Sequence, residues 1–565
     1  MRDLLEIASY IYCGDIATSR GSHWTNKSSI ESWQRELKYV IPVRDYDFWT
    51  QSSVIFQLRE TLNFLTNDIY DFEFRKLNIS DHDQMYIKLS EDKKINDYIF
   101  DKVVLFSGGL DSLAGAIESL HNDEKIILVS HRSNAVLDSR QRKLFFEIQR
   151  KYKKNVYHIP VWVNKAKGLS NDYTQRARSF LFSSLGAIVA HSLSINNIRF
   201  YENGTVSINL PVAEEVVRAR ASRTTHPKTL FYFQKFFSLV TEKKLNVENP
   251  FIYCTKTDVV TKLKKYNAEH LIPLSCSCAH PFEKTKTQWH CGICSQCIDR
   301  RVAILSSGLS EYDSDNDYIT DVFLGKRKIG PQRNMALGYI KLGLDLYDLD
   351  ESVLYEKFSL EISRAIENSD NRSEAAGSII SLLKRHGETV RNVFREQYRS
   401  NSDKIIDGEI EPSSILGLVI GQKHNEKSWM KFANRIFEIL NDGIPIICQT
   451  EKPDIEPRLQ EMCDGLLSSN GEILDREYPF VQWASRLTKP DWQSEEYSLF
   501  VELKYIREKS DISRITRSIS SDITTYGDNG RKTLFVVYDP YYLLISRDKF
   551  VSDIEKHDGQ LAKII

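Results

Sequence analysis

The sequence has no long hydrophobic run. Although 41% of its 565 residues are hydrophobic, no apolar stretch approaches the ~20 residues that a membrane-spanning helix needs. The first residues, Met1–Glu6, carry an acid almost at once and contain no apolar core, so they do not resemble a secretory signal. We therefore expect a cytoplasmic protein with no membrane partner.

The sequence also lacks an excess of charge of either sign. It has 76 lysines and arginines against 77 aspartates and glutamates, for a formal net charge of −1. This balance excludes a global attraction to nucleic acid, so any such binding must come from a local basic patch. The length predicts three or four domains, at the usual ~100–200 residues each.

Cysteines are few and unevenly placed. Five of the nine fall between residues 276 and 297, and a cytosolic chain is not expected to form a disulfide framework, so the clustering indicates a metal site. Cys291, Cys294 and Cys297 follow one another at two-residue gaps, and Cys276 or Cys278 can supply a fourth thiolate. Four thiolates suit a structural, tetrahedral zinc ion, while an iron–sulfur cluster is the alternative.

A glycine-rich loop lies between a predicted strand and a predicted helix. Residues 102–106 are typical of a short buried strand, and apolar residues recur at helical spacing from Leu113 to Leu120. The sequence between them, Ser107–Ser112, reads Ser-Gly-Gly-Leu-Asp-Ser. Such a loop at a helix start can bind a phosphate through its backbone N–H groups, although an ordinary Gly-Gly turn is the alternative. It is neither a Walker A loop nor a dinucleotide fingerprint.

The loop resembles the PP-loop of enzymes that cleave ATP between its α and β phosphates. The resemblance implies that the loop binds ATP and that Asp111 has a catalytic role in holding Mg²⁺. The cofactor-binding residues that it implies in the loop are Ser107, Gly108, Gly109, Leu110, Asp111 and Ser112. Further strand-like runs at 126–129, 156–161 and 198–201 alternate with helices, as a parallel α/β sheet requires.

Residues 101–310 resemble the QueC family of 7-cyano-7-deazaguanine synthases. The family's segment Ser-Cys, then Cys-Gly-x-Cys-x-x-Cys-x-x-Arg, is matched by Ser277, Cys278, Cys291, Cys294, Cys297 and Arg300. The alignment favours Cys278 over Cys276, so the implied zinc ligands are Cys278, Cys291, Cys294 and Cys297. Arg178 begins a helix that resembles the family's Arg-Asn-x-x-Phe helix and joins the implied cofactor-binding residues.

The family's reaction activates the carboxylate of 7-carboxy-7-deazaguanine with ATP and then adds ammonia. Divergent members occur in bacterial anti-phage systems, where the activated deazaguanine is passed to a protein amine. The family's Asp-Tyr-Gly-Gln segment is replaced here by residues 131–134, His-Arg-Ser-Asn, which leaves the acceptor open. Residues 1–100 resemble the leader of defence-associated, Qat-type QueC-like proteins, and residues 311–445 are typical of a mainly helical connecting region.

The region 446–565 has a second candidate active site. Pro490-Asp491 precedes the strand-like run 499–505, in which Glu502 and Lys504 share one face. A helix with isoleucines at helical spacing and a buried strand at 533–540 follow. The region resembles PD-(D/E)XK nucleases, of restriction-endonuclease-like α/β fold, which implies that Asp491, Glu502 and Lys504 are catalytic with Mg²⁺. Local arginines and lysines offer a surface for DNA or RNA.

Together these patterns predict an α/β protein with two active sites. We expect a PP-loop parallel sheet with a zinc loop, a helical middle region and a C-terminal nuclease-like domain, using ATP, Mg²⁺ and zinc. The expected role is anti-phage defence, with a 7-deazaguanine, DNA and a protein of the same defence system as partners. One alternative is a sensor of ATP or deazaguanine that gates the nuclease. Another is a nucleobase- or tRNA-modification enzyme with an inactive C-terminal domain.

Overall fold

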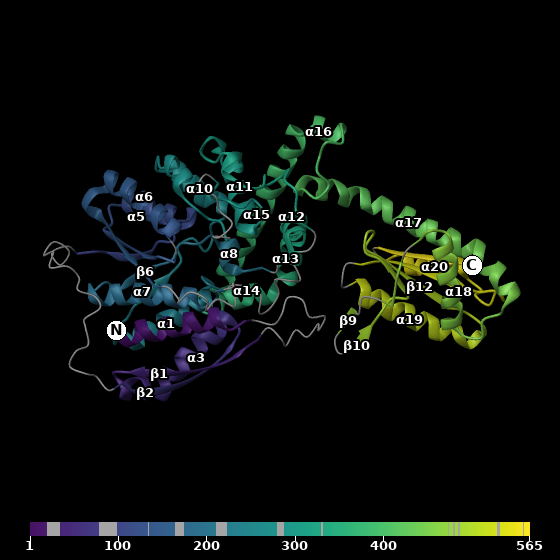
Figure 1. Ribbon diagram of the computed structural model, residues 1–565, viewed down its shortest axis with the longest axis horizontal. Coiled ribbons are helices and arrows are strands. Elements are labelled where there is room, and N and C mark those ends of the chain that lie inside the picture. Colours follow the sequence, from purple (N-terminus) through teal and green to yellow (C-terminus); the bar gives the residue numbers. More distant parts are fainter. Residues whose placement is uncertain are drawn as a thin grey trace. The chain divides into compact units, whose positions relative to one another are not determined.

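The chain divides into two compact units, Met1–Leu418 and Val419–Ile565 (Figure 1). The computed structural model describes residues 1–19, 34–77, 99–133, 135–163, 175–210, 223–279, 288–328, 331–472, 474–477, 481–483, 486–527, 531–557 and 559–565. Across those residues, no helix combines the length and the apolar character that crossing a bilayer demands. Asn134, at the end of the predicted departure from the QueC segment, lies outside the described residues.

The centre of the first unit is a five-stranded, fully parallel sheet in the order β5-β4-β3-β6-β7. The chain enters in the middle, runs outward through β4 and β5, then returns to the other side of β3 for β6 and β7. The strands are β3 (Lys102–Leu105), β4 (Ile126–His131), β5 (Val156–Val161), β6 (Asn197–Arg199) and β7 (Asn246–Glu248). This is the parallel α/β sheet that the sequence predicts.

Alternating apolar residues bury both faces of this sheet, because successive strand side chains point to opposite sides. Val103 of β3 faces one hydrophobic cluster with helices α1, α3, α7 and α9, whereas Val104 faces a second cluster with α5, α6, α10 and α11. The helices are α1 (Arg2–Ala17), α3 (Ser52–Thr66), α5 (Leu110–His121), α6 (Ala135–Tyr152), α7 (Arg178–Ser192), α9 (Pro227–Thr241), α10 (Lys256–Lys265) and α11 (Ser295–Ser306). The result is a sheet between two helical layers.

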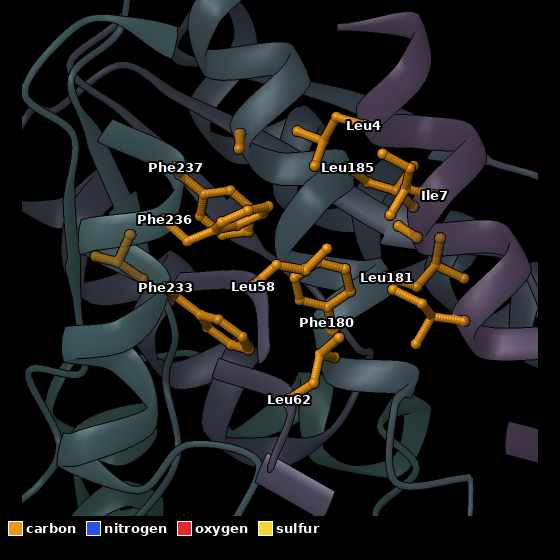
Figure 2. Close-up of a cluster of buried hydrophobic side chains, with 14 of the residues drawn as sticks. Leu4, Ile7, Leu58, Leu62, Phe180, Leu181, Leu185, Phe233, Phe236 and Phe237 are labelled. Carbon is orange, nitrogen blue, oxygen red and sulfur yellow. The ribbon is translucent and has the colours of Figure 1, made fainter. Parts of the chain in front are cut away.

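The N-terminal segment belongs to this core. Strands β1 (Glu36–Val43) and β2 (Ile69–Lys76) pair in parallel, and α2 (Tyr46–Trp49) and α3 connect them. Figure 2 shows Leu4 and Ile7 of α1 beside Leu181 and Leu185 of α7, within one buried cluster. Residues 1–77, as far as they are described, therefore contribute to the same hydrophobic core as the sheet.

One of the helices after residue 330, α15, contacts α10 and the residues just before it. Arg385 of α15 pairs with Asp258 at 3.0 Å and donates to the Tyr253 carbonyl oxygen at 2.8 Å. The chain division accordingly places them in the first unit. They are α12 (Pro331–Asp348), α13 (Glu351–Lys357), α14 (Ser359–Ile366), α15 (Arg372–Ser400) and α16 (Ser402–Ile406), and α17 (Ile415–Thr450) begins just before the boundary between the units.

The second unit has a mixed five-stranded sheet in the order β14-β13-β12-β11-β8. Strands β11 and β12 form an antiparallel hairpin, while β12, β13 and β14 run parallel. The elements are α18 (Glu456–Ser469), β8 (Asp475–Arg476), β9 (Val481–Trp483), β10 (Arg486–Thr488), β11 (Trp492–Ser494), β12 (Leu499–Tyr505), α19 (Lys509–Gly527), β13 (Lys532–Tyr538), α20 (Arg547–Glu555) and β14 (Gln560–Ile564). The predicted hairpin, helix and strand occur in this order.

A buried ion cluster holds the N-terminal segment together. The Arg35 guanidinium lies 2.5 Å from Asp15 and 2.6 Å from Asp68, and all three side chains are buried. Removing one partner of such a cluster leaves buried charge without compensation. We therefore expect Arg35→Leu to lower the free energy of unfolding by about 3–5 kcal/mol, measured by denaturant titration of the first unit's transition.

The matched control is Arg59→Leu. Arg59 pairs with Asp71 in the same segment, but both side chains are about half exposed, and pairs in contact with solvent contribute only about 0–1 kcal/mol. An equal effect of the two substitutions would show that burial of the Arg35 cluster does not set its energetic weight.

Candidate functional site

The order in which successive strands join the sheet reverses between β3 and β6. The connection after β3 leads to β4 on one side, and the connection after β6 leads to β7 on the other. In open α/β sheets, ligands bind in the crevice outside the carboxyl ends of the strands at such a switch point. The loop Ser107–Ser112 follows β3 and residues Glu202 and Asn203 follow β6, so both border this crevice.

The Ser107–Ser112 loop has the geometry of an anion cradle. Gly108 has a φ of +84°, a conformation that favours glycine, and Gly109 is the N-cap of α5. The hydroxyls of Ser107 and Ser112 lie 3.1 Å apart. The first helical bond of α5 runs from the Leu113 N–H to the Gly109 carbonyl, so the amides before it precede the helical ladder and can bind phosphate oxygens.

A cluster of charged groups lies beside this loop. Asp111, on the first turn of α5, forms a buried ion pair with Lys256 at the start of α10. Its other carboxylate oxygen lies 3.4 Å from the Asn203 amide nitrogen. Burial and the Asp111 charge together raise the pKa of Glu202 to about 8. Burial alone would lower the pKa of Lys256, but the charges of Asp111, Glu202 and Asp299 raise it.

The chain just before Cys278 contacts the loop directly. The Cys276 N–H donates to the Gly108 carbonyl oxygen at 2.9 Å, and the Leu110 N–H lies 3.5 Å from the Ser277 hydroxyl. The Arg140 guanidinium stacks over the Trp289 ring at 3.6 Å and donates to the Ser275 carbonyl oxygen at 3.3 Å. The contacts of Cys276 and Ser277 connect the loop after β3 to a segment more than 160 residues later, and Arg140 of α6 binds the same segment.

Four cysteine thiols meet at one point. The Sγ atoms of Cys278, Cys291, Cys294 and Cys297 all lie within 4.8 Å of one another. A tetrahedral zinc with Zn–S bonds of about 2.3 Å separates its sulfurs by about 3.8 Å, and the Cys291 and Cys297 sulfurs are 3.8 Å apart. The cluster therefore fits zinc, and Cys278 rather than Cys276 completes it. Cys276 instead directs its thiol toward the Trp289 carbonyl oxygen at 3.6 Å.

Helix α11 links the cysteine cluster to the crevice. Cys294 is its N-cap and Cys297 lies in its first turn, followed by Asp299 and Arg300. The buried Arg300 binds Asp313 at 2.9 Å and the Ser275 hydroxyl at 2.8 Å. Asp299 accepts a hydrogen bond from Tyr339 of α12 at 3.0 Å. The cysteine cluster thus lies at the start of the helix that carries Asp299, whose charge acts on Lys256.

Arg178 lies at the start of α7, as the sequence predicts. The N–H of the preceding residue, Ala177, donates to Asp15 of α1 at 2.8 Å, so this end of α7 is held against the N-terminal helix. Burial lowers the pKa of Arg178, and the Tyr12 side chain counteracts this effect. No contact between Arg178 and the Ser107–Ser112 loop is found among the described residues.

In the second unit, the predicted residues Asp491, Glu502 and Lys504 come together. The Lys504 ammonium donates to the Glu502 carboxylate at 2.6 Å, and Asp491 accepts from the Leu503 N–H at 2.7 Å. Glu502 and Lys504 are only 3% and 6% exposed. This burial distinguishes them from a Glu-x-Lys pair on a solvent-exposed strand face. Burial and the Glu502 charge raise the pKa of Asp491, while the Lys504 charge counteracts this effect.

Three further side chains adjoin this trio that the sequence did not predict. Tyr526 of α19 donates to Glu502 at 2.8 Å, and Asp522 lies 3.9 Å from the Lys504 ammonium. Glu456, at the start of α18, accepts from the Tyr505 N–H at 3.1 Å. The sequence carries a signal for two of these side chains. Asp522 and Tyr526 are four residues apart on the helix that follows the strand, so both lie on one face of it.

The fold is that of an α/β domain with a crevice at the switch point of its sheet and a four-cysteine cluster that fits a zinc ion. Residues 101–308 match the family described as queuosine biosynthesis protein QueC. This part of the chain, somewhat over a third of it, is a QueC family domain, which implies a PP-loop enzyme that uses ATP. A comparison with curated proteins found no match.

The cysteine cluster yields a test of the metal. We expect the purified protein to contain one zinc ion per chain and Cys291→Ser to lose it, with a marked loss of stability because metal affinity contributes to folding free energy. Elemental analysis together with thermal denaturation measures both. Cys276→Ser is the matched control and should retain zinc. Iron with sulfide in the wild type would instead indicate an iron–sulfur cluster.

Proposed function

We propose that the first unit cleaves ATP to AMP and pyrophosphate and adenylates a carboxylate. The observation that carries this proposal is the meeting of Asp111, Glu202 and Lys256 beside the Ser107–Ser112 loop at the switch point of the sheet. Carboxylates beside a phosphate-binding loop suit Mg²⁺, which takes oxygen ligands from proteins and phosphates. The QueC family match over residues 101–308 supports the same chemistry.

Each group in the crevice has a distinct task in this proposal. The Ser107 and Ser112 hydroxyls and the backbone of Gly108, Gly109 and Leu110 bind the pyrophosphate part of ATP. Asp111 and Glu202 hold Mg²⁺, which would neutralise charge on the phosphate oxygens. Lys256, released from its ion pair with Asp111, stabilises the negative charge that develops on the leaving pyrophosphate.

The acceptor that we propose is a 7-deazaguanine bearing a carboxylate. Activation of that carboxylate prepares it for attack by ammonia or by a protein amine. The QueC family match supports a 7-deazaguanine precursor. Because an additional unit follows the family domain, we favour conjugation within a bacterial anti-phage system and a partner protein from the same system. This last step rests on association rather than on geometry.

We propose that the second unit is a Mg²⁺-dependent nuclease acting on DNA, with RNA as the alternative substrate. The supporting observation is the convergence of Asp491, Glu502 and Lys504 at the hairpin, with Glu456 beside them. Asp491 and Glu502 would hold the metal, and Lys504 would orient the attacking water. The order of helix, antiparallel strands, helix and parallel strand supports this assignment.

The products formed from ATP test the proposed reaction of the first unit. We expect wild-type protein to convert ATP to AMP and pyrophosphate when 7-carboxy-7-deazaguanine and candidate protein partners are present, and mass spectrometry should identify the conjugate. Asp111→Asn and Glu202→Gln should each reduce turnover by about a hundredfold or more, because charge stabilisation in the transition state is lost.

Glu118→Gln is the control for these substitutions. Glu118 lies two turns along α5 from Asp111 and pairs with Lys262, away from the crevice, so its loss should leave turnover within about twofold. Release of ADP and phosphate by the wild type would contradict α–β cleavage. Binding of ATP without turnover under any condition would favour the sensor alternative.

Cleavage of nucleic acid tests the proposed activity of the second unit. We expect Glu502→Gln and Lys504→Met each to abolish Mg²⁺-dependent cleavage while AMP formation continues, because the two sets of residues belong to different compact units. Glu461→Gln is the matched control, since Glu461 is exposed and pairs with Arg458 at 2.8 Å. Gel assays on DNA and RNA, with and without the partner proteins, measure this.

Protection of cells against infection gives an independent readout for the same variants. If Glu502→Gln and Lys504→Met protect cells as well as the wild type, and neither DNA nor RNA is cut, the C-terminal unit has a structural role. That outcome would support the modification enzyme with an inactive C-terminal domain.

A further inference from the structure

Arg327 is a buried cation that lies outside the residues matched to the QueC family. The residue is only 1% exposed, yet it forms no ion pair in the part of the chain that the structure describes. Its guanidinium donates to three backbone carbonyl oxygens instead, those of Val322 at 2.8 Å, Gly292 at 3.0 Å and Gly325 at 3.1 Å. The Nε atom has no hydrogen-bond partner among the described residues. A buried charge is costly unless another charge compensates it, so this position favours a negative group nearby.

The residues just before this arginine pack against the turn that holds the cysteines. The Ile319 N–H donates to the His290 carbonyl oxygen at 2.8 Å. The Thr320 N–H donates to the Cys291 carbonyl oxygen at 3.3 Å. Gly292 has a φ of +79°, and an added Cβ there would collide with the Thr320 carbonyl oxygen. The two segments are therefore in close contact, and the bond from the guanidinium to the Gly292 carbonyl is part of it.

The charge of a zinc–thiolate centre matches what this cation lacks. Zinc bound by four thiolates carries excess negative charge, and three of the four cysteines, Cys291, Cys294 and Cys297, are buried. The Arg327 guanidinium bonds to the residue that directly follows Cys291. Asp321, the other acidic group close in sequence, accepts from two backbone N–H groups at 2.8 and 2.6 Å and forms no ion pair with Arg327.

We propose that Arg327 positions the metal-binding turn and compensates the excess negative charge of the zinc–thiolate centre. The Arg327 N–H donates to the Ser413 hydroxyl at 3.2 Å, which anchors its segment just before α17. Both residues lie beyond 308, where the family match ends, so the zinc site draws on more of the chain than the family domain. This inference goes beyond the proposed function, because it concerns retention of the metal and neither of the two reactions.

Three variants of the full-length protein test this role. Arg327→Gln removes the charge but keeps a side-chain N–H donor, whereas Arg327→Lys keeps the charge but loses the guanidinium fork. Lys326→Gln is the matched control, because it removes a positive charge from the neighbouring residue, which is exposed. A chromogenic zinc chelator in excess gives the rate constant of zinc release, and circular dichroism shows whether each variant folds.

We expect Arg327→Gln to release zinc about tenfold faster than the wild type or more, because loss of a group that supports metal ligands typically weakens binding by about 10–100-fold. Arg327→Lys should release zinc about threefold faster or more, between the wild type and Arg327→Gln. Lys326→Gln should stay within about twofold. Release from folded Arg327→Gln within about twofold of the wild type overturns the proposal, and so does a wild-type protein without zinc. Should Arg327→Gln not fold, Arg327→Lys decides by the same limit.

Cobalt(II) in place of zinc separates charge compensation from packing. Its sulfur-to-metal charge-transfer band depends on the electron density of the thiolates, which a nearby cation lowers. Arg327→Gln should therefore move the band to longer wavelength, whereas Arg327→Lys and Lys326→Gln should leave it close to the wild-type position. Faster release with an unmoved band in Arg327→Gln would mean that Arg327 acts through packing alone, and the proposed compensation of charge would be wrong.

Discussion

Three carboxylates act on one ammonium group in the crevice between β3 and β6. Asp111 pairs with the buried Lys256, whose pKa is also raised by the charges of Glu202 and Asp299, and burial together with the Asp111 charge raises the pKa of Glu202 to about 8. Burial of unpaired negative charge is costly. A divalent cation removes that cost and brings phosphate oxygens with it, so the charge imbalance is the physical basis of the proposed ATP chemistry.

Other parts of the first unit converge on this crevice. The segment before the cysteine cluster binds the backbone of the phosphate-binding loop through the Cys276 N–H, and α11 carries Asp299 to it. Tyr339 of the middle helices binds Asp299 from the other side. The cysteine cluster and α12 therefore both adjoin Asp299, the carboxylate whose charge acts on Lys256.

The sequence could predict what is encoded locally. The phosphate-binding loop, the cysteine spacing and the hairpin of Glu502 and Lys504 each lie within a short window, and the structure has the elements that these windows predict. Pairs such as Asp111 and Lys256 lie 145 residues apart, so no local pattern reveals that they meet. Glu202 had an indirect signal, because it directly follows a predicted strand and carboxyl ends of parallel strands share one edge. The choice of Cys278 over Cys276 needed the resemblance, since spacing alone allows both.

The same distinction decides how the second unit is interpreted. Glu502 and Lys504 are near neighbours on one strand, which made them predictable, but Glu-x-Lys pairs are common on exposed strands and are no argument for a site. What separates this pair is non-local: Asp491 from the preceding strand region, Tyr526 from α19 and Glu456 from α18 all approach it, and the pair is almost fully buried. A core of well-packed apolar residues would be at least as stable as such a charged group. Stability alone therefore does not explain this cluster, which supports the proposal of a metal-binding site there.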